Sequence, residues 1–553
     1  MPKKDYDNWS KIELIKEIKK LEKRKKYGIV WEDKPEQVAE LCKEKLPVLK
    51  EEKTKEIISD DNGFDIIVEG DNYHALSVLN YTHRGMIDVI YIDPPFNTGA
   101  KNWKYNNDYV DKEDAFRHSK WLSFMEKRLK LAKPLLKRNG VLICAIDENE
   151  LWHLGPLLEE IFVGFEIHIV TIVHNPRGVQ GKNFSYTNEF AYFVLPKGQK
   201  IIGSRKLNEE EIYYSNLRTW GGESTRSTAR NCFYPIIIED DKIVGFGEVP
   251  DEDFHPNSQT EERNGQYYVW PIDIKGIERK WRYARQSIES ISNLLSIKNN
   301  KGRIEIIIGK DFGTIKTVWQ DPKYDASEYG TKLVHALVPG NHFDFPKSVY
   351  NVYDCLFPII SERKESIILD FFAGSGTTGH AVMMINKAKE GCRKFILCTN
   401  NENGIAEDIC YPRIKSVIDG NLDYMDITGI KSNIKYFKTD FVDSDPTDEN
   451  KKKLVDKSTE ILCLKEDCFN NIKSDTYYKI FKNSRDKYLG IVFDDEGIEP
   501  IKNEIINISK MFVLYVFSLD NSAREEEFQD ISNIVEIKPI PIGILNAYKR
   551  IFR

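Results

Sequence analysis

The stretch ILDFFAGSGTTG, residues 368–379, has the pattern of a buried strand, a glycine-rich turn and the first turn of a helix. Gly374, Gly376 and Gly379 fit the spacing G-x-G-x-x-G, in which glycines let the backbone pass close to a nucleotide-like ligand. The amino end of the following helix favours a carboxylate or another negative group. This unit predicts an α/β protein with a ligand-binding turn at the carboxyl end of a parallel strand.

The residues around the turn indicate which ligand it takes. Asp370 ends the strand, two phenylalanines precede the glycines, and no lysine follows them, so a Walker-type phosphate loop is not expected. An acid at the strand tip suits a cationic ligand with an amino group, such as S-adenosylmethionine, better than a pyrophosphate. An NAD-dependent oxidoreductase remains the alternative, because Glu402 lies near the spacing expected of a ribose-binding acid.

A second strand, in the stretch DVIYIDPPFNTG at residues 88–99, ends in the tetrad DPPF. The apolar run at 89–92 suits a central parallel strand, and the two prolines end it because neither has an N–H to donate. Asp93 supplies a carboxylate, Pro94 and Pro95 supply rigid carbonyl acceptors, and Phe96 supplies an aromatic face. Because ligands bind at the carboxyl ends of parallel strands, these four residues predict a site.

The composition sets the class of protein. The chain has 553 residues, 41% hydrophobic and 30% charged, as in an ordinary globular protein of several domains. It has no apolar run of membrane-spanning length and no signal-peptide core, so we expect a cytoplasmic protein without membrane contacts. The nine cysteines lack metal-ligand spacing, so we expect no metal site. A net charge of −7 argues against general coating of nucleic acid, but not against local contacts.

Together the two motifs resemble those of the DNA amino-methyltransferases, with DPPF at 93–96 as the catalytic tetrad and FAGSG at 372–376 as the cofactor loop. The tetrad precedes the loop, and an irregular basic segment separates them, which resembles the permuted β group. Further stretches resemble modification subunits of type III restriction–modification systems: GDNYHAL at 70–76, EYGTKL at 328–333, FDFPKSV at 343–349 and ICYPRIKSVI at 409–418. The implied fold is a circularly permuted, Rossmann-like methyltransferase sheet.

The resemblance and the breaks in strand–helix alternation divide the chain into five parts. We expect a basic helical segment without a core of its own, the catalytic half, a target-recognition region, the cofactor-binding half, and a small separate C-terminal α/β domain that begins with a polar linker at 440–452. Their bounds are 1–60, 61–174, 175–327, 328–439 and 440–553. Within the catalytic half, residues 118–140 should form one helix that Gly140 ends.

The activity that the resemblance implies is methyl transfer from S-adenosylmethionine to the N6 amine of an adenine flipped out of duplex DNA. Asp93 and the Pro94 carbonyl would each accept an N–H bond from the amine, and Phe96 would stack on the base. Asp at the first tetrad position favours adenine over cytosine N4, whereas Phe replaces the Tyr usual in adenine enzymes. A cytosine-N4 enzyme, an RNA or protein methyltransferase, and a non-catalytic DNA-binding subunit remain alternatives.

The resemblance also implies which residues hold the cofactor. Phe345 and Lys347 lie in a segment similar to the contact with the methionine end, and a side chain at Gly376 should enter the cofactor's space. The ribose contact falls among Thr399, Asn400, Asn401 and Glu402. The full set that we carry forward is Asp71, Asn72, Phe345, Lys347, Asp370, Phe372, Ala373, Gly374, Gly376, Thr377 and Asn400.

Two basic stretches are candidates for DNA contact. One is an expected helix at 11–26, and the other is the region 275–303, in which aromatic residues are interleaved with the charges. The predicted DNA-contact residues are Arg279, Lys280, Trp281, Arg282 and Arg285. A solvated basic surface is the alternative. The implied partners are double-stranded DNA, a second copy of the chain in a homodimer, and a separately encoded restriction subunit with helicase and nuclease activity.

Overall fold

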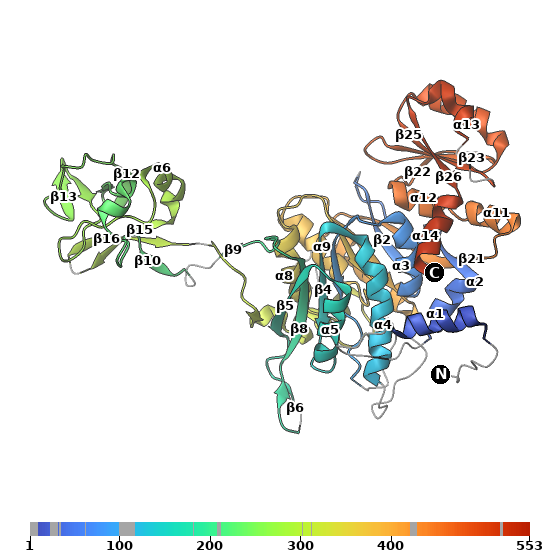
Figure 1. Cartoon of the computed structure of the whole chain (residues 1–553), viewed down its shortest axis with the longest axis horizontal. Coiled ribbons are helices and arrows are strands. Elements are labelled where there is room, and N and C mark those ends of the chain that lie inside the picture. The colour runs from blue at the N-terminus through green and yellow to red at the C-terminus, as the bar shows by residue number, and fades with distance from the viewer. Residues whose placement is uncertain are drawn as a thin grey trace. The chain divides into compact units, whose positions relative to one another are not determined.

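The computed structural model divides into two compact units (Figure 1), the main unit of Met1–Ile201 and Lys316–Arg553 and the insert unit of Ile202–Ile315. None of the helices in the described residues is long and apolar enough to cross a membrane. The structure describes residues 9–22, 31, 35–60, 62–98, 117–180, 182–206, 212–300, 302–310, 312–420, 428–519, 522 and 524–552.

A ten-stranded sheet forms the centre of the main unit, in the order β1-β21-β2-β20-β19-β3-β4-β8-β5-β18. Strands β21, β2, β20, β19, β3 and β4 run parallel, while β1 and β8 are antiparallel to their neighbours β21 and β4. Every residue of β3 is buried, as expected of a strand covered on both faces. The bounds are β1 Lys45–Glu51, β2 Phe64–Glu69, β3 Ile87–Ile92, β4 Leu136–Ile146, β5 Phe165–Val173, β8 Asn188–Pro196, β18 Val318–Trp319, β19 Ile367–Asp370, β20 Lys394–Thr399 and β21 Asn433–Asp443.

Helices cover both faces of this sheet. The crossovers through α3, α4 and α5 advance along the sheet in one direction, whereas the crossover through α9 runs in the other. Because such crossovers are right-handed, α9 lies on the opposite face, and α8 packs against it. The bounds are α3 Asn72–Thr82, α4 Arg117–Ala132, α5 Leu151–Ile161, α8 Val349–Ile360, α9 Thr377–Ala388 and α10 Tyr411–Asp419.

The N-terminal segment is less independent than predicted. Helices α1 (Lys11–Glu22) and α2 (Gln37–Glu44) agree with the helical pattern, and residues 23–26 of the expected basic helix lie outside the described residues. The expectation that 1–60 lacks a core is wrong for its second half, because β1 pairs along β21 and buries Val48 and Leu49. Its apolar run is only four residues long and is flanked by lysines, which hides the strand in the sequence.

Two further expected boundaries are wrong. Helix α4 ends at Ala132, because Pro134 cannot donate the next helical hydrogen bond, and Gly140 lies inside β4. The stretch 440–452 is not a linker either: β21 extends to Asp443, and α11 (Asp448–Asp456) follows directly. The outer half of β21 pairs only with the edge strand β1 on one side, so it tolerates the polar residues that suggested a linker.

The C-terminal part is an α/β layer that shares the core of the main unit, rather than a separate domain. Helices α12 and α14 pack on α3, and the Tyr548 hydroxyl donates to the carbonyl oxygen of Pro47. Tyr515 belongs to the same core cluster. The bounds are α12 Thr459–Glu466, α13 Ile498–Ile508, α14 Ile542–Phe552, β22 Asn470–Ser474, β23 Tyr478–Lys482, β24 Tyr488–Val492, β25 Phe512–Phe517 and β26 Val535–Ile540.

In its described residues the insert unit has a three-stranded and a four-stranded antiparallel sheet around its own core, to which Tyr234, Trp281 and Ile306 belong, and a two-stranded sheet of β9 (Arg205–Lys206) and β17 (Phe312–Gly313). It is narrower than the irregular region predicted at 175–327, because β8 and β18 at its two ends are strands of the central sheet. The bounds are β10 Tyr214–Asn216, β11 Ile236–Glu239, β12 Lys242–Phe246, β13 Thr260–Arg263, β14 Gln266–Val269, β15 Leu295–Asn300, β16 Arg303–Gly309 and α6 Arg285–Ile288.

Candidate active site

The two motifs found in the sequence lie on neighbouring strands. Strand β19 pairs in parallel with β3, with Ile368 opposite Val89 and Leu369 opposite Ile90. Because parallel strands end at the same edge, the tetrad after β3 and the glycine turn after β19 meet there. Segments far apart in the chain therefore build one site.

Asp93 is bound to a cation from the chain itself. The Lys347 Nζ lies 3.3 Å from the Asp93 carboxylate and 4.4 Å from the centre of the Phe96 ring. Burial raises the pKa of Asp93 to about 6, and the Lys347 ammonium opposes this rise. Burial alone would lower the pKa of Lys347, but the charges of Asp93 and Glu189 hold it above its usual value. The lysine is therefore charged, and its ammonium lies beside the Asp93 carboxylate and over the Phe96 ring.

Glu189 is a site residue that the sequence analysis missed. It lies on β8, is buried, and accepts hydrogen bonds from the Lys347 ammonium and, at 2.6 Å, from the Asn351 side-chain amide. The signal was a single acid at the start of the apolar strand NEFAYFVL. One charge at a strand end usually faces solvent, so sequence alone does not distinguish this one.

The tetrad backbone is held from α4. The Trp121 indole donates to the Pro95 carbonyl at 2.6 Å, so that this acceptor is already in use. Pro94 is buried, and no donor from the described residues binds its carbonyl. Phe96 is half-buried and packs against the main core. Of the acceptors in the tetrad, the Asp93 carboxylate and the Pro94 carbonyl are the two that suit an incoming amine.

Asp370 shapes the glycine turn from within. Its two carboxylate oxygens accept from the Phe372 backbone amide at 2.9 Å and from the Thr378 hydroxyl at 2.5 Å. Burial raises the pKa of Asp370 to about 7, and these two hydrogen bonds oppose the rise. The Ala373 amide donates to the Cys398 carbonyl, which ties the turn to β20.

Gly374 and Gly376 have φ angles of 51° and 78°, in the left-handed region that glycine adopts most easily. A Cβ at Gly376 would lie 3.1 Å from Cys410 Sγ, and one at Gly374 would lie 3.3 Å from Phe343 Cζ. A Cβ at Gly376 is directed at Cys410 of the protein itself, because the turn packs directly on the segment before α10. The expectation that a side chain there enters the cofactor's space stays a prediction.

A buried arginine that the sequence analysis did not single out supports the start of α9. Arg413 Nη1 donates to the Thr377 hydroxyl at 2.7 Å and to the Ser375 hydroxyl at 2.9 Å. Burial lowers the pKa of Arg413 to about 10. The Thr377 hydroxyl is therefore already hydrogen-bonded within the protein.

Asp71 and Asn72 lie at the start of α3, and Asn72 is bonded to the strand end before the turn. Asp71 caps that helix by accepting from the Tyr73 amide at 2.7 Å. The buried Asn72 amide donates to the Phe371 carbonyl at 2.9 Å and accepts from Arg128 Nε at 2.6 Å. Phe372 is likewise buried. In this structure Asn72 joins β19 to α4, so its contact with the protein is structural.

A hollow of about 370 Å³ lies beside the glycine turn. Its wall includes Phe343, the residue that a Cβ at Gly374 would meet, and Asp408 from the segment that follows β20. The lining residues are Val338, Pro339, Gly340, Asn341, His342, Phe343, Asn403, Ile405, Asp408 and Ile409. The sequence analysis did not name any of them as a site residue.

The remaining cofactor candidates differ in surroundings. Phe345 has a φ of 57° and is 82% exposed. Asn400 directly follows β20, the strand next to β19. Among the ribose candidates, Asn401 accepts from the amides of Ala406 and Glu407, and Thr399 is fully buried. Asn400 and Glu402 thus remain the better placed pair.

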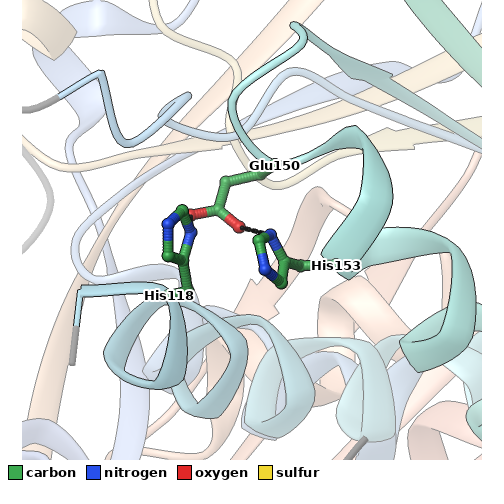
Figure 2. A group of neighbouring side chains, drawn as sticks. All are labelled: His118, Glu150 and His153. Atoms are coloured by element: carbon green, nitrogen blue, oxygen red, sulfur yellow. Dashed lines mark hydrogen bonds and ion pairs between the residues drawn. The ribbon is translucent and has the colours of Figure 1, made fainter. Parts of the chain in front are cut away.

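Within the described residues, one group has the spacing of metal ligands: His118, Glu150 and His153 (Figure 2). However, Arg117 Nε donates to His118 Nε2 at 3.1 Å, which leaves the imidazole proton on Nδ1, facing Glu150. A protonated nitrogen cannot bind a metal. The hydrogen bonds and the adjacent Arg117 charge favour a hydrogen-bonded network over a metal centre.

In the insert unit the five predicted DNA-contact residues have different roles. Trp281 is only 2% exposed and donates to the Tyr234 carbonyl at 2.8 Å, so the prediction that it lies against DNA is wrong. Successive residues of an extended segment face opposite sides, and an aromatic among charges turns inward here. Arg282 is exposed and Lys280 half-buried.

The other two arginines are bound to acids. Arg279 pairs with Asp273 at 2.8 Å, and Arg285 pairs with Glu289 at 2.9 Å and Glu248 at 3.3 Å. An arginine whose guanidinium already holds a carboxylate has less to offer a phosphate. Arg282 and Lys280 are therefore the stronger candidates of the five.

The topology and the paired motifs define a class. Residues 87–411 match the family described as DNA methylase, the N6/N4 methylases, and the chain belongs to this family. This match confirms the resemblance drawn from the sequence, and the sheet confirms the predicted α/β fold class.

Particular relatives come from restriction–modification systems. The EcoPI Mod subunit of a type III enzyme from Escherichia phage P1 is 28% identical over 390 residues, 62% of this chain and 58% of that subunit. The type II methyltransferase M.KpnI from Klebsiella pneumoniae is 29% identical over 395 residues, 66% of this chain and 88% of that enzyme. The chain thus spans little more than half of the first relative. The M1.HpyAVI–SAM complex has a TM-score of 0.31 and 13% identity, covering 63% of this chain and 98% of that one.

Proposed function

We propose that the chain is a DNA methyltransferase that transfers the methyl group of S-adenosylmethionine to the N6 amine of adenine in duplex DNA. The parallel pairing of β3 with β19 carries the proposal, because it brings an amine-accepting carboxylate beside a cofactor turn. Family membership and the names of the relatives, a Mod subunit and a type II methyltransferase, support it.

The chemistry needs an acceptor pair and an aromatic face. Asp93 and the Pro94 carbonyl each accept one N–H bond from the amine, which directs the nitrogen lone pair at the sulfonium methyl. As the N–C bond forms, the C–S bond breaks with its electrons on sulfur, and the nitrogen then releases one proton. Phe96 stacks on the base, which must leave the duplex to reach this site. Positioning of this kind can lower the activation free energy by roughly 7–11 kcal/mol.

Lys347 belongs to this amine site in our proposal, which replaces the expectation that it contacts the methionine end of the cofactor. Its ammonium holds Asp93 in the absence of a base and must move from it when the amine binds. Glu189 provides the second carboxylate on which the ammonium remains. A retained cation facing the nitrogen would oppose the positive charge that develops there.

The cofactor fits along the edge of β19 and β20. The turn at Gly374 and Gly376 faces the methionine part, and the hollow bounded by Phe343 and Asp408 takes the nucleoside. Asn400 is placed for the ribose, and the exposed Phe345 is available to cover the bound cofactor. Asp370, Asn72 and Thr377 act by holding the turn in shape.

We further propose that the insert unit reads the DNA sequence, through Arg282 and Lys280 among others. Its own core sets it apart from the catalytic sheet, which is the expected arrangement for a module that recognises a separate ligand. A separately encoded restriction subunit is proposed as a partner because relatives are named Mod subunits of restriction–modification enzymes, and a homodimer is proposed from the family resemblance of the sequence.

The deciding experiment uses tritiated S-adenosylmethionine with duplex DNA, RNA and protein acceptors, followed by digestion and mass spectrometry of the nucleosides. We expect N6-methyladenine in duplex DNA only. N4-methylcytosine would change the assigned base, and label in RNA or protein alone would overturn the proposal. The Asp93→Ala variant provides the background.

A further inference from the structure

Asn97, the residue after the tetrad, has an unusual backbone conformation, and its side chain is hydrogen-bonded to two neighbouring residues. Asn97 has a φ of 55°, a left-handed conformation that asparagine tolerates better than most residues, and it is buried. Its side-chain amide donates to Glu150 Oε1 and to the Arg117 carbonyl at 3.3 Å. The backbone that carries Phe96 is therefore fixed through the Asn97 amide.

Glu150 is fully buried between two histidines (Figure 2). Besides the Asn97 amide, Oε1 accepts from His118 Nδ1 at 2.7 Å, and Oε2 lies 3.0 Å from His153 Nδ1. The two imidazole rings stack with their centres 4.2 Å apart. A buried carboxyl group needs partners, and here His118 on α4 and the Asn97 side-chain amide supply them to Oε1.

The hydrogen bonds of the network converge on Glu150 Oε1. The donation from Arg117 to His118 Nε2 fixes the His118 proton on Nδ1, from which it is donated to Glu150. Burial, followed by the nearby His153 and Arg117, lowers the pKa of His118 to about 4, so this ring stays neutral. Arg117 thus donates to His118 and His118 to Glu150, while Asn97 donates to the same Glu150 oxygen from the side of the tetrad loop.

Helix α4 holds the same loop at a second point. Trp121, three residues beyond His118, donates to the Pro95 carbonyl at 2.6 Å. Positions three apart lie on one face of a helix, so His118 and Trp121 reach the loop together. The tetrad loop is therefore hydrogen-bonded at Pro95 and at Asn97, and these bonds leave the side chains of Asp93 and Phe96 available to a substrate.

We propose that Glu150 is a positioning residue of the methyl-transfer site, which with His118 and His153 holds Asn97 and so fixes the aim of Asp93 and Phe96. This inference rests on the proposed function of the tetrad. A misplacement of about 1 Å in such a site can cost about a hundredfold in rate.

The first test is a double-mutant cycle in the full-length chain. Glu150→Ala and Asn97→Ala should each lower kcat about a hundredfold, with the S-adenosylmethionine affinity unchanged. The double variant should be no slower than either single variant, because both changes release the same loop. Glu150→Gln, which keeps the Oε1 acceptor, should stay within tenfold of the wild type. Glu159→Ala, an exposed acid on α5, is the matched control.

Multiplicative losses in the cycle, or an unchanged kcat in Glu150→Ala, would overturn the inference. Hydrogen exchange gives a readout independent of activity: the amides of Asp93, Phe96 and Asn97 should exchange faster in Glu150→Ala, while those of β19 stay protected. This holds even if the wild type methylates nothing, an outcome that would remove the proposed function alone. Unchanged exchange of these amides would overturn the positioning role. One equivalent of metal retained by the wild type and lost in His153→Ala would replace it with a metal-binding role.

Discussion

The Lys347 ammonium lies 3.3 Å from the Asp93 carboxylate, at the place that our mechanism gives to the target amine. It also lies over the Phe96 ring, against which the base would stack. An internal cation thus pairs with the buried Oδ1 of this half-buried carboxylate until a base replaces it. Leaving a buried charge unpaired would be costly, which gives the lysine a physical reason to be there.

Removing the amine acceptor should stop the reaction without emptying the cofactor site. We expect Asp93→Ala to lose at least about 10²–10³-fold in turnover, and Asp93→Ser to keep residual activity at most. Calorimetry should show nearly unchanged S-adenosylmethionine affinity in both variants. Turnover of Asp93→Ala within tenfold of the wild type would take this residue out of the mechanism.

The rate should depend on pH through Asp93. The carboxylate accepts N–H bonds most strongly when it is ionised, and burial raises its pKa to about 6, so kcat/KM should fall as the pH drops through about 6. Lys347 lowers this pKa, whereas Glu189 and Asp147 raise it. Lys347→Met should therefore move the acidic limb to higher pH. Profiles of kcat/KM against pH test this, with the exposed Lys364→Met as control, and a limb that stays in place would contradict it.

Substitution in the glycine turn should act on stability. Gly376→Ala places a Cβ 3.1 Å from Cys410 Sγ at a φ of 78°, which should cost about 1–2 kcal/mol from the backbone, plus the strain of contact. Gly85→Ala is the matched control, because its φ is 69° and nothing lies within 4 Å of the added Cβ. Thermal unfolding of both variants should give the larger loss for Gly376. Equal losses would show that packing against Cys410 contributes nothing.

The hollow beside the turn should control cofactor affinity. Phe343→Ala removes an aromatic wall, which is worth about 0.5–1.5 kcal/mol beyond its buried area, so the dissociation constant should rise several-fold or more. At saturating S-adenosylmethionine, kcat should stay near that of the wild type. Equal affinity in a folded Phe343→Ala protein would place the nucleoside elsewhere.

In the insert unit, substitution of Arg282 should affect DNA binding, whereas substitution of Arg279 should affect stability. Arg282→Gln should weaken binding of all DNA sequences and reduce the salt slope by about one, if its contact is with a phosphate. Arg279→Gln breaks the pair with Asp273 and should lower the melting temperature more than the DNA affinity. Filter binding over a salt series and thermal unfolding separate the two. An unchanged salt slope in Arg282→Gln would mean that this side chain faces solvent.

Local patterns in the sequence predict much of this site, because a strand, a turn and the next helix are encoded by neighbouring residues. DPPF and FAGSG each announce the end of a buried strand, and both strands form where expected. Which strands become neighbours depends on packing across the whole chain. For that reason Glu189, the bracing by Arg413 and the hydrogen bonds of Asn97 emerged only from the structure.

The errors have equally local causes. Trp281 among basic residues has the pattern of a nucleic-acid contact, yet its side chain belongs to the core of the insert unit. β1 is too short a run to stand out, and the polar outer half of β21 has the composition of a linker. In each case the structure of the segment depends on the surface that it packs against, which its own composition does not reveal.

The insert unit leaves the main chain after β8 and returns before β18, two strands that both pair with β5. Among the described residues of 202–315, none pairs with a strand of the central sheet. A gene can accept insertions, deletions or a foreign segment there while the register of β3 against β19 is preserved. Under the proposed roles, new target sites can evolve by exchange of one cassette, and the chemistry is inherited intact.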